Sequence, residues 1–94
     1  MKINAEIWKV YNDRDDYMIA AANVVFEDSF VIKNVRLIKT PEKTFIGMPS
    51  FRNRRDGRWR DNCHPINAEF RQEMFEAVME AYEDYIAMAD DEQE

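Results

Sequence analysis

The residues with the clearest chemistry are five arginines crowded into one short segment. They are Arg52, Arg54, Arg55, Arg58 and Arg60. The surrounding residues 46–66 contain only two acids, so the positive charge is a local feature of a chain that is acidic overall. A guanidinium group is flat and permanently charged, and it can hold two phosphate oxygens at once. We therefore predict that these arginines bind the backbone phosphates of a polyanion.

A turn signal lies at the centre of this arginine-rich segment. The tetrapeptide 55–58 reads Arg-Asp-Gly-Arg, and an Asp-Gly pair between two apolar runs predicts a β-hairpin. The arginines would then lie at a hairpin tip. Under a simpler interpretation, this tip is only solvated, and its arginines pair with acids such as Glu69 and Glu73. Phosphate binding would instead weaken as salt rises, because each contact releases counterions.

Two aromatic residues, Phe51 and Trp59, flank the arginine-rich tip. An exposed ring could stack on an unpaired base. An aromatic residue in a strand of a small domain more often lies in the core or in a contact between subunits, and the same holds for Trp8. We expect Phe51 to be exposed and to belong to the nucleic-acid site, and Trp59 to lie in the core.

The single cysteine and the single histidine are neighbours, Cys63 and His64. Adjacent side chains on an extended chain point to opposite faces, and two ligands fall short of the three or four that zinc needs. Adjacency is also a poor geometry for activating a thiol. We expect no catalytic residue, metal, cofactor or small-molecule substrate. We assign His64 a structural role, as a hydrogen-bonding partner of the turn that precedes the helix.

Charge is divided unevenly along the chain. Residues 1–65 carry 12 lysines and arginines against 9 acids, a net charge of +3. Residues 66–94 carry Arg71 alone against 10 acids, a net charge of −9. The isoelectric point near 4.8 argues against sequence-blind coating of DNA. It allows a local phosphate site, because charges more than about 8–10 Å away are largely screened.

Length and composition indicate one domain in a reducing compartment. A chain of 94 residues has one small core, and its lone cysteine excludes an internal disulfide. No apolar stretch approaches the length of a membrane span, and the first residues, Met1 to Glu6, meet a charge too soon for a signal peptide. We expect a cytoplasmic protein without a membrane partner.

Alternating apolar and polar residues predict strands in the first two thirds of the chain. The predicted strands are 3–11, 17–27, 30–39, 44–48 and, shortest, 58–63. A polar turn is expected at residues 12–16. Pro49 ends the fourth strand, since proline has no N–H to donate to a ladder.

A long helix is predicted from the N-cap residue Asn67 to about Met88. Its apolar stripe consists of Phe70, Met74, Ala77, Val78, Ala81, Tyr82 and Tyr85, and acids line the opposite face. Residues 89–94 would form a flexible acidic tail. We therefore predict an α+β fold over residues 1–88, with an antiparallel sheet of about five strands and one long C-terminal helix. The stripe is wider than one small sheet covers, which indicates a second subunit.

Five motifs occur in a characteristic order. They are Phe30–Ile38 (FVIKNVRLI), Phe45–Ser50 (FIGMPS), Asp56–Asp61 (DGRWRD), His64–Asn67 (HPIN) and Arg71–Gln72. This series resembles the SpoVG family of bacterial septation and sporulation regulators, over about residues 3 to 85. The resemblance implies an antiparallel sheet with a packed C-terminal helix, a homodimer, and binding of DNA and RNA through a basic surface. It implies a regulator and no enzyme.

The resemblance also bears on single arginines. Arg60 takes the place of the family's arginine before the aspartate, and Arg58 falls just after Asp-Gly. Arg52, Arg54 and Arg55 stand where the family has basic residues after Met-Pro-Ser. The loop before Asp56 is about one residue longer than in the family pattern, and it holds Phe51 and extra arginines.

Two functions from different classes follow from these observations. The first is a nucleic-acid-binding regulatory protein whose arginine loops, doubled in a homodimer, dock on phosphates. The second is a protein-interaction adaptor whose arginine loop recognises an acidic protein partner. The acidic isoelectric point favours the adaptor, and the resemblance favours the regulator.

Overall fold

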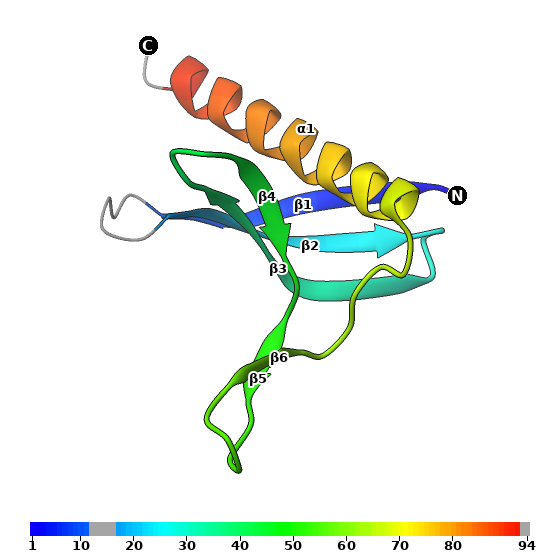
Figure 1. The fold of residues 1–94 in the computed structure, drawn as a ribbon. Coiled ribbons are helices and arrows are strands. Elements are labelled where there is room, and N and C mark those ends of the chain that lie inside the picture. The colour runs from blue at the N-terminus through cyan, green and yellow to red at the C-terminus, as the bar shows by residue number, and fades with distance from the viewer. Residues whose placement is uncertain (12–16, 93–94) are drawn as a thin grey trace.

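The computed structural model describes residues 1–11 and 17–92, which form six strands and one helix within this part of the chain (Figure 1). The elements are β1 Ile3–Val10, β2 Met18–Phe26, β3 Phe30–Lys39, β4 Thr44–Gly47, β5 Ser50–Arg52, β6 Trp59–Asp61 and α1 Ala68–Glu92. Strands β1 to β4 form one antiparallel sheet in chain order, and β5 pairs with β6 in a second sheet. The predicted α+β fold is therefore confirmed.

The strand predicted at residues 58–63 is present as β6, in the second sheet. It is shorter than expected, and it pairs with β5 rather than extending the main sheet. Strand β5 was missed because Pro49 ends the preceding run, although the chain becomes extended again directly afterwards. The sheet of about five strands is thus four strands plus a two-stranded hairpin.

The core lies between α1 and one face of the main sheet. Alternate residues of β2, Ala20, Ala22, Val24 and Phe26, belong to the buried cluster. Their neighbours on β3, Val35 and Leu37, are fully buried, and so is Val78 on the helix. The rings of Phe26 and Phe70 stack with centroids 5.6 Å apart. Burial of this single face holds the domain together.

The helix begins as its cap predicts. The side-chain oxygen of Asn67 accepts a hydrogen bond from the backbone N–H of Phe70 at 2.7 Å. This bond satisfies one of the N–H groups that a helix leaves without a partner in its first turn. The helix ends at Glu92, four residues beyond the predicted end. The predicted polar turn at residues 12–16 lies outside the described residues, and the flexibility of the tail at residues 89–94 stays a prediction.

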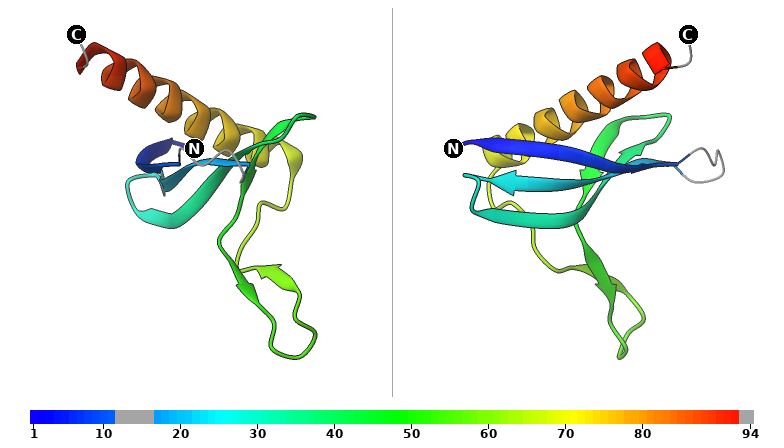
Figure 2. Two further views of the ribbon diagram at one scale, coloured as in Figure 1. Left: turned by 90° about the vertical axis from the view of Figure 1, so that its left-hand side faces the viewer. Right: turned by 180° about the vertical axis from the view of Figure 1, so that it is seen from behind.

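The two faces of α1 are divided as the sequence predicts, up to the last turns. Met74 and Val78 are buried, while Glu69, Glu73, Glu76, Glu80, Glu83 and Asp84 are exposed. Tyr85 belongs to the predicted apolar stripe, but 44% of its surface is exposed. Figure 2 shows the reason: α1 is tilted, and its C-terminal end rises away from the sheet.

The hairpin of β5 and β6 projects on the side of the main sheet opposite to α1, in all three views (Figures 1 and 2). The acidic helix and the arginine-rich hairpin therefore occupy opposite sides of the molecule. The uneven division of charge along the sequence becomes a separation in space.

We expect Asn67→Ala to lower the free energy of unfolding by about 1 kcal/mol, because the N–H of Phe70 loses its acceptor. Urea unfolding followed by circular dichroism measures the change. Asn67→Asp retains an acceptor oxygen and is the matched control, with little expected loss. Equal losses in both variants would contradict the capping role.

Candidate functional site

The hairpin tip is the six-residue segment 53–58 between β5 and β6, and Asn53 and Arg58 close an inner loop of residues 54–57. The backbone N–H of Asn53 donates to the carbonyl of Arg58 at 2.8 Å and closes the loop. The N–H of Gly57 donates back to the carbonyl of Asn53, also at 2.8 Å. Gly57 has a φ of 71°, a left-handed conformation that glycine adopts without steric cost. The Asp-Gly pair predicted as the turn therefore lies in a loop that is longer than a two-residue hairpin turn.

Two side chains brace this loop from within. The side-chain oxygen of Asn53 accepts a hydrogen bond from the N–H of Arg55 at 2.8 Å. Asp56 accepts one in the same way from the N–H of Arg58 at 2.9 Å. Such bonds from a side chain to the backbone two residues on mimic a backbone turn. They order the loop without covering its arginine side chains.

The structure brings all five predicted arginines to this one hairpin, where they fall into two groups. Arg52 and Arg60 are held: Arg52 Nε donates to the carbonyl of Gly57 at 3.3 Å, and Arg60 Nη2 forms an ion pair with Asp56 at 2.9 Å. Arg54, Arg55 and Arg58 are exposed residues of the tip and form no ion pair with any described residue. Their charge is open to an external anion.

The described acids of α1 form no ion pair with the hairpin. Among the described residues, the ion pairs are Lys2–Asp28 and Arg60–Asp56, and neither involves the helix. The sheet lies between the hairpin and α1 (Figure 1). The interpretation in which Glu69 and Glu73 pair with the arginine loop therefore has no support in the described structure.

The two aromatic residues of the hairpin are both exposed. Phe51 is 48% exposed, as predicted. The prediction that Trp59 lies in the core is wrong, since this side chain is 68% exposed. The strand that carries Trp59, β6, belongs to the projecting hairpin and not to the main sheet that packs on α1. Trp8 on β1, 50% exposed, is not in the core either.

Arg36 contacts the root of the hairpin, and it is not among the site residues predicted from the sequence. Its Nη2 donates to the carbonyl of Met48 at 3.0 Å, just before the chain leaves the main sheet. Arg36 lies opposite Gly47 in the β3–β4 register, and a Cβ at Gly47 would lie 3.0 Å from that nitrogen. The N–H of Asn62 donates to the carbonyl of Pro49 at 2.7 Å and closes the root. The only sequence signal for Arg36 is its place in the family-like motif.

A shallow groove continues from this root onto the outer face of the main sheet. Its volume is about 300 Å³, and it is lined by Asn34, Arg36, Pro49, Ser50 and Asn62. The lining is polar and carries one positive charge. The positive charge of Arg36 on β3 thus lies in the groove beside the root of the hairpin.

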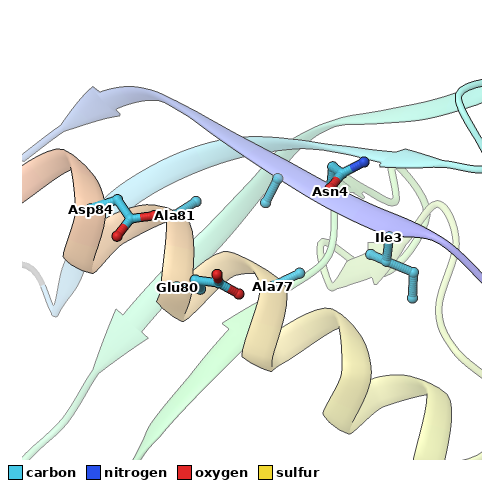
Figure 3. A pocket seen from close by; sticks show the side chains of 7 residues that line it. Ile3, Asn4, Ala77, Glu80, Ala81 and Asp84 are labelled. Carbon is cyan, nitrogen blue, oxygen red and sulfur yellow. The ribbon is translucent and has the colours of Figure 1, made fainter.

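A second groove, between β1 and α1, has the opposite charge (Figure 3). Its volume is about 190 Å³. Ala77 and Ala81 leave space beside the strand, and the carboxylates of Glu80 and Asp84 stand at its border. Two carboxylates repel a phosphate, so this groove is no site for a polyanion.

Cys63 and His64 lie between the hairpin and α1. The Cys63 thiol is free, and the His64 Nδ1 is 3.1 Å from the carbonyl of Pro65, in the turn before the helix, as predicted. The described residues contain no group of three or more potential metal ligands. Within the same part of the chain, no helix is long and apolar enough to cross a membrane.

Comparison with known proteins gives a consistent result. The family model described as SpoVG matches residues 1–84. A Treponema denticola protein is 48% identical over 64 residues, which cover 68% of each chain. A Macrococcus caseolyticus protein is 44% identical over 70 residues, covering 74% of this chain and 60% of the relative. An Acetivibrio thermocellus protein is 39% identical over 75 residues, covering 80% and 79%. All three carry the name "Putative septation protein SpoVG", and the matches confirm the resemblance seen in the motifs.

We expect the cost of Gly47→Ala to depend on Arg36, because the added methyl group would crowd the guanidinium against Met48. In a double-mutant cycle with Arg36→Met, urea unfolding should give a coupling energy of about 1 kcal/mol. The alanine should be tolerated better in the Arg36→Met background, where the guanidinium is gone. A coupling energy of zero would show that Gly47 serves no such purpose.

Proposed function

The chain belongs to the SpoVG family, and we propose that it is a nucleic-acid-binding regulatory protein whose β5–β6 hairpin docks on the backbone phosphates of DNA or RNA. One observation carries the proposal: Arg54, Arg55 and Arg58 are exposed at a braced loop, without an internal ion pair among the described residues. The relatives are named for septation. As part of the proposal, we extend to this chain a role in septation or sporulation control. We also propose that it acts in the cytoplasm.

The distribution of charge supports docking in one orientation. Residues 50–61 carry five arginines against two acids, while residues 68–92 carry one arginine against nine acids. Salt screens the electrostatic interaction of a charged group beyond about 8–10 Å. A nearby phosphate therefore responds mainly to the charges on the side of the molecule that it approaches. Phosphates would be attracted to the hairpin and repelled by α1. Contacts of this kind position the nucleic acid, and base readout would be modest.

We also propose that the protein works as a homodimer, which would present two hairpins at a fixed separation. Exposed apolar surface supports the proposed homodimer. Met1 and Phe30 are 75% and 65% exposed. Together with Phe26, Ile32 and Phe70 they line an apolar hollow of about 310 Å³. Light scattering of the purified protein tests the proposal, and a monomer at micromolar concentration would contradict it.

Replacing Arg54 and Arg55 together with alanine tests phosphate docking. Binding to unrelated sequences should weaken by similar factors, because phosphates carry no sequence information. The slope of log affinity against log salt should become shallower by about 1.4 to 1.8, at about 0.7 to 0.9 per lost contact. Gel-shift titrations over a salt series measure both effects.

The matched control replaces Lys39 and Lys43 with alanine, which removes the same charge at the β3–β4 turn. This control should keep the wild-type slope. If both double variants lose affinity equally, net charge rather than the hairpin explains binding. If the wild type binds neither DNA nor RNA at low salt, the adaptor with an acidic protein partner becomes the better hypothesis.

Asp56→Asn should strengthen binding. The substitution removes the charge that holds Arg60, while the amide oxygen can still accept the bond from the N–H of Arg58. One more available guanidinium would steepen the salt slope by up to about 0.9. Asp61→Asn is the control, since Asp61 has no ion pair among the described residues. Equal slopes for the two variants would show that Arg60 makes no phosphate contact.

A further inference from the structure

The hairpin has a feature that phosphate docking does not use, which is its exposed aromatic surface. Trp59 is 68% exposed and Phe51 is 48% exposed, although both lie within strands. A tryptophan buries a large apolar surface when it packs, and one left in water on a projecting element is a candidate contact residue. The described residues therefore cover each ring only in part.

The register of the hairpin places each ring beside an arginine. Phe51 lies opposite Arg60, and Trp59 lies opposite Arg52. Side chains directly opposite in an antiparallel pair have Cβ atoms about 4.5–5.5 Å apart. Successive residues of a strand point to opposite faces, so the two pairs lie on different faces of the ribbon. Each face therefore combines one flat ring with one guanidinium group.

The two arginines of these pairs are tethered within the hairpin, whereas the tip arginines are not. Arg52 is bound to the carbonyl of Gly57, and Arg60 is bound to Asp56. These bonds hold the guanidinium groups near the loop and leave both rings exposed. The arginines at the tip remain available to bind the phosphates next to a base that stacks on Trp59 or Phe51.

This combination of exposed rings and arginines fits an unpaired base better than a paired one. Within a duplex, both faces of every internal base are covered by its neighbours in the stack, so a side-chain ring finds a free base face only at the ends. In a single strand, every base has a face that can stack on an aromatic side chain, while a basic groove follows the backbone. Arginines alone would serve either form of nucleic acid.

We infer that the β5–β6 hairpin is a single-strand binding site, in which Trp59, with Phe51 on the other face, stacks on unpaired bases while the tip arginines hold the flanking phosphates. This inference rests on the proposed function and adds to it the class of nucleic acid and the residue that selects it. Trp59 discriminates single strands from duplexes, and the arginines set the common electrostatic affinity.

The test compares two ligands, a thymidine oligomer of about 12 nucleotides and a blunt duplex of similar length. Trp59→Ala should weaken binding to the oligomer by about 5- to 150-fold and leave duplex binding within about twofold. Trp59→Phe should retain most of the affinity, because it keeps an aromatic ring. Trp8→Ala is the matched control, an exposed tryptophan outside the hairpin, and it should bind like the wild type.

A spectroscopic measurement separates stacking from a structural role. In a Trp8→Phe background, Trp59 is the only tryptophan, so its emission reports on the hairpin alone. The oligomer should quench this emission, and the duplex should not. Light scattering on Trp59→Ala should show the wild-type mass. A loss of mass would place Trp59 in a contact between subunits and overturn the inference.

The outcomes also separate this inference from the proposed function. If the wild type binds neither ligand at low salt, the proposed function fails, and the inference fails with it. If the wild type binds both ligands, and Trp59→Ala weakens both equally or neither, only the inference is overturned. A duplex preference of the wild type would likewise overturn it and leave phosphate docking intact.

Discussion

The packing of α1 on one face of a four-stranded sheet is the constraint on which the rest of the structure depends. A chain of this length has a single small core, and that core uses one face of the sheet and one stripe of the helix. Once the stripe of Met74 and Val78 is buried, the acids of α1 must face water on the far side. The hairpin projects from the other side of the sheet (Figure 1). The core thus keeps the acids of α1 and the arginines of the hairpin apart, and no ion pair joins them among the described residues.

The direction of the hairpin is set at a short junction between the two sheets. Arg36 binds the carbonyl of Met48, and Gly47 leaves room for its guanidinium. Pro49 follows and cannot donate to the β3 ladder, so the chain leaves the main sheet there. A proline, a glycine and one arginine on the neighbouring strand therefore determine where five other arginines are displayed. We regard Arg36 as a positioning residue for the proposed docking surface.

Sequence reasoning succeeded where a local pattern determines the structure. Alternation predicted the four strands of the main sheet, and Asn67 predicted the first turn of the helix. It failed for Trp59 because alternation indicates a strand but not the sheet to which the strand belongs. Whether Trp59 meets the helix or water depends on the pairing of β6 with β5, which is a tertiary choice. The clustering of the arginines was predictable from their spacing in the sequence. The bonds of Arg52 to Gly57 and of Arg60 to Asp56 were not, because they depend on the conformation of the loop.

The exposure of Trp59 also bears on the energetics of the hairpin. A two-stranded ribbon is marginally stable in water, and this one contributes nothing to the buried cluster. A tryptophan buries about 150–250 Å² when it packs, and the roughly two thirds of it left exposed at Trp59 corresponds to about 2.5–4 kcal/mol that folding of the chain forgoes. The loop is instead ordered by hydrogen bonds from Asn53 and Asp56, which leave the rings and the tip arginines in water. Under the proposed function, the apolar surface that folding leaves exposed remains available for binding, and a ligand that covers the rings would stabilise the hairpin as it binds.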